Sequence, residues 1–234
     1  MKKLVLLGGI LVFLFVLIAG IYYFVIRADT GSRSANVMEW IKHPLDHPDW
    51  SIRAKERCPE AVFSMPTSGF IGFLWDDSFR PGHRHSGLDI FSGTEPGTTP
   101  VFAAMDGYLT RESDWISTII IRIPQDPLNP ERQIWTYYTH MADKDGRSFI
   151  EPSFPPGTTE VFVESGTLIG YQGNFSGTAG SPTGNHLHFS IVKDDGSGKY
   201  LNELEIENTI DPSPYFQISL NAKNQPAKIP VCNP

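Results

Sequence analysis

The sequence predicts an all-β fold, a small domain of antiparallel strands preceded by one N-terminal transmembrane helix. Three observations support the β domain. The 234-residue chain contains 21 glycines and 19 prolines, scattered without a period, which suits many short strands and turns better than helices. β-Branched and aromatic residues are dense in segments such as 116–123 and 134–140. With 40% hydrophobic residues, the chain is long enough to bury one core.

Residues 1–29 are predicted to be a membrane anchor. Two lysines precede an uncharged run over residues 4–26, which is long enough to cross a bilayer as a slightly tilted helix. A cleavable secretion signal is the alternative, but its apolar core is usually about 7–15 residues and ends in a small-x-small site. Ala19 and Gly20 form such a site poorly. We therefore expect an uncleaved single-pass anchor with the domain outside the cytoplasm; cleavage would give a secreted protein instead.

The remaining chain divides into three parts. Residues 30–57 are expected to form a polar linker with one short helical turn around residues 38–41. Residues 58–217 form the compact domain, and residues 218–234 form a C-terminal tail. An additional hypothesis is that the linker folds back over the active cleft and supplies an inhibitory ligand.

The cysteine and charge content agree with an exported location. Cys58 and Cys232 are the only cysteines and bracket the domain, so an oxidising compartment would allow a disulfide between the tail and the domain entrance. Two unpaired thiols are the alternative. The formal net charge of −7 and the lack of a basic patch argue against a nucleic-acid partner. The sequence carries no signal for an oligomer.

Several strands are expected along the domain. A strand, a tight turn at Asp106-Gly107 and a second strand are expected over residues 97–109, because Asp-Gly between apolar runs is a strong hairpin signal. Residues 116–123 and 134–140 form a strand and its returning partner. The Gly/Ser/Thr-rich residues 173–184 are expected to form a loop over the rim of the cleft.

The segment HLHF places two histidines on a predicted strand. Successive side chains of a strand point to opposite faces, so His186 and His188 share one face while Leu187 and Phe189 point into a core. Two imidazoles at this spacing can flank one metal ion, or place one ligand beside one acid–base group. Surface histidines, or core histidines with satisfied hydrogen bonds, are the alternative interpretation.

Other segments supply the remaining polar residues. His85 and Asp89 are four apart in an extended segment, so both can point into a cleft, and an imidazole nitrogen with a carboxylate oxygen suits zinc. His83 is expected to lie on the rim. His140 ends the strand over residues 134–140 and adds a further histidine.

Three motifs in this order resemble the signatures of the lysostaphin/LytM-type zinc metallopeptidases. They are HSGLD (85–89), YYTHM (137–141) and NHLHF (185–189), and supporting segments such as GTTPVFAAMDGYL and IDPSPYF extend the resemblance over roughly residues 60–217. The resemblance implies a narrow substrate groove floored by the sheet. It also implies one Zn²⁺ per chain held by His85, Asp89 and His188, with His140 and His186 as catalytic, non-ligand histidines.

The resemblance also implies an activity and a substrate. The expected function is a membrane-anchored zinc metalloendopeptidase that hydrolyses peptide cross-links of bacterial peptidoglycan, using zinc-activated water and two assisting histidines. Either His140 or His186 is a candidate for the general base. Two other interpretations stay open: a peptidase for an exported protein outside the wall, and a non-catalytic activator or binding domain of cell-wall hydrolases.

Overall fold

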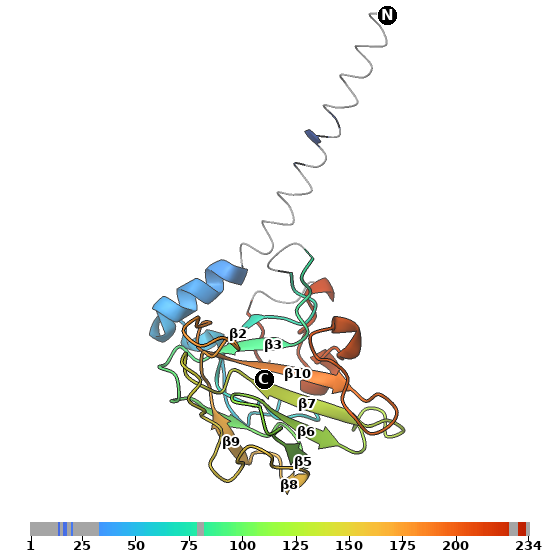
Figure 1. Ribbon diagram of the computed structural model, residues 1–234. Helices are drawn as coiled ribbons and strands as arrows, with labels where there is room; N and C mark the ends of the chain where they lie inside the picture. The colour runs from blue at the N-terminus through green and yellow to red at the C-terminus, as the bar shows by residue number, and fades with distance from the viewer. Residues whose placement is uncertain are drawn as a thin grey trace, which may run out of the picture.

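The computed structural model describes residues 14, 16, 17, 20, 33–78, 82–224 and 229–232. Within this part of the chain the domain is mostly β, as predicted, and every strand pair is antiparallel. Eight strands form one large sheet in the order β1-β2-β3-β10-β7-β6-β5-β8, and β4 pairs with β9 in a second sheet (Figure 1). The strand β10 therefore lies near the middle of the large sheet, between β3 and β7.

The strands are short and are joined by loops and single helical turns. The strands are β1 (Ser51–Ile52), β2 (Gly69–Phe73), β3 (Leu88–Phe91), β4 (Pro100–Phe102), β5 (Gly107–Thr110), β6 (Ile119–Ile123), β7 (Ile134–Thr139), β8 (Val161–Val163), β9 (Leu168–Tyr171) and β10 (His186–Lys193). The helical turns are η1 (Pro44–Asp46), η2 (Pro48–Trp50), η3 (Ile206–Asn208), α2 (Ser213–Phe216) and η4 (Ala222–Asn224).

The main hydrophobic core contains side chains from both sheets. Leu187, Phe189 and Ile191 of β10 are fully buried in it, so the alternating residues His186 and His188 lie on the opposite face of the large sheet. This confirms the alternation predicted for the HLHF segment. The core thus fixes which face of β10 carries the polar side chains.

The core also encloses one buried hydroxyl. Tyr138 of β7 is fully buried, and its hydroxyl accepts a hydrogen bond from the backbone N–H of Ala104 at 2.9 Å. Because a buried polar group without a partner is costly, this bond makes the tyrosine compatible with its apolar surroundings.

The hairpin predicted over residues 97–109 is wrong. The strand β4 pairs with β9, whereas β5 pairs with β6 and β8, so the two strands belong to different sheets. Gly107 is needed for a different reason: a Cβ there would lie 2.5 Å from the carbonyl oxygen of Arg122 on β6. The glycine therefore permits the close approach of two paired strands.

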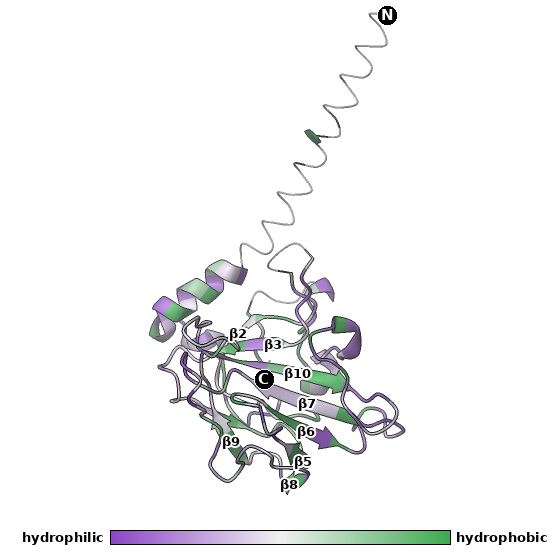
Figure 2. Cartoon of the chain, viewed as in Figure 1, coloured by the Kyte–Doolittle hydropathy of each residue, from purple (hydrophilic) through white to green (hydrophobic). Residues whose placement is uncertain are grey.

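The segment expected to be a linker packs against the sheet. Residues 33–42 are α-helical, which is longer than the single turn predicted, and this helix carries both hydrophobic and hydrophilic residues (Figure 2). Its Val37 and Trp40 form a hydrophobic cluster with Phe70 of β2 and Phe91 of β3. The Trp40 indole N–H donates to the carbonyl oxygen of Phe91 at 2.8 Å. The chain then enters the sheet as β1.

The predicted anchor helix over residues 4–26 lies almost entirely outside the described residues. Of that range, residues 14, 16, 17 and 20 are described, and they are helical. Among all described residues, no helix has the length and the apolar character needed to span a membrane.

A disulfide joins Cys58 to Cys232, which confirms the predicted pairing. The Cα atoms are 5.3 Å apart, and the bond links positions separated by 174 residues. The tail also contacts the domain without the disulfide, because Leu220 is buried in the main core and Asn221 pairs with Trp75. The two ends of the domain are therefore held together by covalent and noncovalent contacts.

Candidate active site

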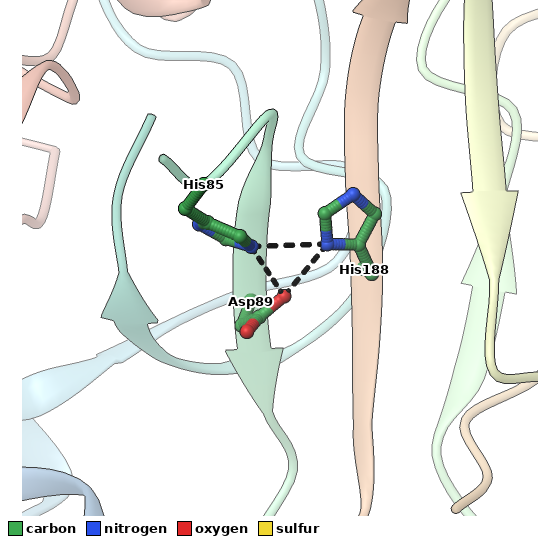
Figure 3. A group of neighbouring side chains, drawn as sticks. All are labelled: His85, Asp89 and His188. Carbon is green, nitrogen blue, oxygen red and sulfur yellow. Dashed lines mark hydrogen bonds and ion pairs between the residues drawn. The ribbon is translucent and has the colours of Figure 1, made fainter. Parts of the chain in front are cut away.

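Three predicted ligands meet at the junction of β3 and β10. Asp89 on β3 and His188 on β10 are register partners, and His85 lies in the turn that leads into β3 (Figure 3). The Nε2 atom of His85 is 3.0 Å from Asp89 Oδ1 and 3.1 Å from His188 Nδ1, and the latter two atoms are 2.8 Å apart. All three residues are buried. This group is called the ligand trio below.

The hydrogen bonds on the outer sides of the rings fix the proton positions. His85 Nδ1 lies 2.9 Å from the carbonyl oxygen of Leu74, and we assign a proton to this nitrogen because a carbonyl only accepts. His188 Nε2 lies 2.7 Å from Glu203 Oε1, so this nitrogen donates in the same way. The inner nitrogens, His85 Nε2 and His188 Nδ1, are therefore the ones that would present lone pairs to a metal ion, which would displace the proton that His188 Nδ1 shares with Asp89. Two nitrogen lone pairs and a carboxylate oxygen converge on one point, which is the donor set of a catalytic zinc site.

The electrostatics of the trio also favour a cation. Burial would raise the pKa of Asp89, but the neighbouring His85 and His186 and the hydrogen bond from His188 hold it well below its usual range. Burial would lower the pKa of His188, but the charge of Glu203 and the hydrogen bonds to Asp89 and Glu203 raise it to about 10. The protein therefore stabilises positive charge at the position where the three donors meet. The residues present fit a bound Zn²⁺.

Glu203 is a residue of the site that the sequence interpretation missed. Its side chain is almost fully buried, and Oε1 accepts hydrogen bonds from His188 Nε2 and from the Ser86 hydroxyl, each at 2.7 Å. Burial would raise the pKa of Glu203, but the charge and hydrogen bond of His188 lower it to about 2. Its position 15 residues after His188, in an irregular segment, offers no spacing signal.

The two predicted catalytic histidines lie beside the trio. The rings of His140 and His186 have centroids 4.5 Å apart. His140 Nδ1 donates to the carbonyl oxygen of Phe175 at 2.6 Å, and His186 Nδ1 donates to that of Gly184 at 2.7 Å. Each ring therefore keeps its Nε2 lone pair available. His186 Nε2 lies 3.6 Å from Asp89 Oδ1, which places it against the trio.

The surroundings of both imidazoles favour the neutral form. Burial lowers the pKa of His140 to about 3, and the neighbouring His186 and His188 add to this shift. Burial also lowers the pKa of His186, although Asp89 and the Gly184 carbonyl oppose the change. A neutral imidazole with a free lone pair is the form that accepts a proton in general-base catalysis.

The backbone at the end of β7 has an unusual conformation, which orients the His140 side chain. This residue has φ +73°, in the left-handed region that a non-glycine residue seldom adopts. Gly173 packs directly against this turn: a Cβ there would lie 2.2 Å from the Ala142 carbonyl oxygen and 2.5 Å from that of His140. The glycine therefore allows the 173–184 loop to approach the turn and place the Phe175 carbonyl beside the imidazole.

All five predicted site residues line one groove of about 590 Å³. His83 lies on its wall, as expected for a rim residue. Aromatic and apolar side chains extend the walls away from the trio; these are Trp115, Ile116, Tyr137, Phe175 and Leu204. Among the described residues that line the groove there is no lysine or arginine. Within the described part of residues 30–57, no side chain lines the groove or joins the trio, so the inhibitory-ligand hypothesis gains no support.

Comparisons with known proteins gave matches among solved structures. No protein-family model and no curated protein matches the chain. The chain is similar to the catalytic domain of lysostaphin from Staphylococcus simulans (20% identity, 64% of this chain and 90% of that chain, TM-score 0.40). It is also similar to the catalytic domain of a mutant of the prophage-encoded M23 protein EnpA from Enterococcus faecalis (19% identity, 64% and 94%, TM-score 0.35).

A further similar structure is a zinc-containing peptidase from Vibrio cholerae (18% identity, 64% of this chain and 40% of that chain, TM-score 0.35). Many of the structural neighbours are lysostaphin/LytM-type M23 peptidase domains. The match spans 55% of the longer lysostaphin chain.

Proposed function

We propose that this chain is a zinc metalloendopeptidase that hydrolyses peptide cross-links of bacterial peptidoglycan and is held at the outer face of the membrane by its N-terminal segment. The observation that carries the proposal is the convergence of three electron-pair donors in one groove beside two neutral imidazoles. That combination provides a metal site and a proton acceptor within one sheet face.

The ligand trio would hold the metal through His85 Nε2, Asp89 Oδ1 and His188 Nδ1. Zinc bound there supplies Lewis acidity, which makes a water molecule more acidic and a peptide carbonyl more electrophilic. The protein supplies three ligands, which leaves room for a water or substrate oxygen, as catalytic zinc sites require.

His140 and His186 carry out the proton transfers. His140 is more exposed than His186, and we propose that its Nε2 takes the proton of the attacking water. The Phe175 carbonyl, which accepts from Nδ1–H, then stabilises the imidazolium that forms. This imidazolium can pass its proton to the nitrogen of the leaving amine, so that the peptide bond breaks. His186, whose Nε2 lies beside the trio, is positioned to take the second proton of that water when the product carboxyl group forms.

The groove favours a peptide over a charged polymer backbone. Its aromatic walls can contact an extended peptide, and the absence of lysine and arginine from its described lining offers no site for phosphate. The sequence resemblance and the proposed anchor support a peptide of the cell wall as the substrate.

The test uses the detergent-solubilised full chain with zinc and isolated peptidoglycan. We expect release of soluble fragments with new amino termini, abolished by a chelator and by His85→Ala or His140→Ala. Release that persists in both variants would overturn the mechanism. A parallel reaction on a glycine-rich protein tests the substrate: cleavage of that protein with intact peptidoglycan would overturn the wall assignment.

A further inference from the structure

We propose that Glu203 is a positioning residue that orients His188, fixes the proton on its Nε2 and thereby sets the zinc affinity of the site. This inference rests on the zinc site of the proposed function. It concerns a carboxylate that none of the three sequence motifs contains.

The geometry places Glu203 behind His188. Its Oε1 atom bonds to His188 Nε2, whereas the trio uses Nδ1 on the other side of the ring. The carboxylate therefore holds the ring from its outer side and does not act as a fourth ligand. A metal-bound histidine that donates its other ring N–H to a carboxylate is held in one tautomer and one orientation, and it becomes a more basic ligand.

The same carboxylate oxygen also connects two ligand-bearing segments. It accepts the hydroxyl of Ser86 at 2.7 Å, and Ser86 is the neighbour of His85. One buried atom thus contacts both the turn before β3 and the side chain of β10. Loss of the Glu203 carboxylate would leave the Ser86 hydroxyl and the His188 Nε2–H without an acceptor. The segment that carries His85 would then no longer be connected to His188 through this carboxylate.

The segment that carries Glu203 is itself fixed to the sheet. After β10 the chain turns back, with the Leu201 N–H donating to the Lys193 carbonyl at 3.0 Å. The ring of Tyr200 packs against Trp135 and Trp115, with centroids 5.5 and 5.9 Å apart. A supporting group must be held rigidly to position another side chain, and these contacts provide that rigidity.

Two substitutions separate orientation from charge. Glu203→Gln keeps an oxygen that can accept from His188 but removes the negative charge, whereas Glu203→Ala removes both. Glu205→Gln is the matched control: it makes the same charge change two residues away, at a side chain that is exposed. Ser86→Ala tests the second hydrogen bond while leaving the Glu203–His188 pair intact.

The measurement is the zinc affinity of the full chain, from competition with a chromogenic chelator, with circular dichroism to confirm folding. We expect Glu203→Ala to weaken zinc binding about 10- to 100-fold. Glu203→Gln and Ser86→Ala should weaken it less, and Glu205→Gln should leave it unchanged. Cobalt substituted for zinc should give an altered absorption spectrum in Glu203→Ala, because the ligand geometry changes.

The outcomes distinguish the two proposals. Wild-type zinc affinity in folded Glu203→Gln and Glu203→Ala, with an unchanged cobalt spectrum, would overturn the role of Glu203 alone. If Glu203→Ala does not fold, an unaltered affinity in Glu203→Gln and Ser86→Ala would overturn it equally. A full chain that binds no zinc at all would overturn the zinc site and this inference together.

Discussion

The disulfide between Cys58 and Cys232 should contribute a large part of the stability of the domain. Closing a loop between positions 174 residues apart removes conformational freedom from the unfolded chain, and the chain-entropy relation gives about 5 kcal/mol at room temperature. Measured losses for native disulfides are typically about 2–5 kcal/mol. Contacts of Leu220 and Asn221 remain in the folded state, so the change acts mainly through the unfolded chain.

The perturbation is the double substitution Cys58→Ala/Cys232→Ala, measured by urea unfolding of the full chain. We expect the free energy of unfolding to fall by about 2–5 kcal/mol. Reductant should lower the wild-type value to that of the variant and leave the variant unchanged, which provides the internal control. A decrease in the free energy of unfolding of less than about 1 kcal/mol, or an equal effect of reductant on both proteins, would refute the reasoning.

Three other outcomes are expected. Burial raises the pKa of Tyr138 to about 12, whereas the pKa of tyrosine in the unfolded chain is near 10. The stability that this burial contributes is therefore complete below pH 10 and is lost as the pH rises through 12. Tyr138→Phe should reduce the fall in the free energy of unfolding over this pH range, measured by urea unfolding at several pH values, and an unchanged fall would contradict this. Gly173→Ala should displace the His140 turn and lower wall cleavage at least about tenfold in a folded protein, and full activity would argue against it. A chelator should lower the thermal unfolding temperature and zinc should restore it, whereas identical temperatures would contradict a metal site.

Much of the site was predictable because strand periodicity is local. The alternation in HLHF is enough to place His186 and His188 on one face, whichever strands become neighbours. His85 reaches the same face from a turn, because Gly87 lets that turn approach β10: a Cβ there would lie 2.3 Å from the Phe189 carbonyl oxygen.

The features that escaped prediction depend on pairing between distant segments. Asp106-Gly107 has the local chemistry of a hairpin, yet β4 finds its partner in β9, because strand choice is decided by the whole sheet. Glu203 reaches His188 only through the fold of the segment after β10. The helix over residues 33–42 mixes polar and apolar residues, and its docking depends on the apolar surface that Phe70 and Phe91 present.

The docked helix determines where a truncated protein should begin. The carbonyl oxygen of Phe91 accepts a hydrogen bond from the Trp40 indole N–H. The ring of Phe91 stacks on the ring of His186, with centroids 4.9 Å apart. A protein begun at residue 58, the boundary that the sequence suggests, would expose Phe70 and Phe91 and remove the Trp40 hydrogen bond to Phe91, whose ring packs on His186. A fragment expressed for crystallisation or assays should therefore begin before residue 33, so that it retains the helix packed on Phe70 and Phe91.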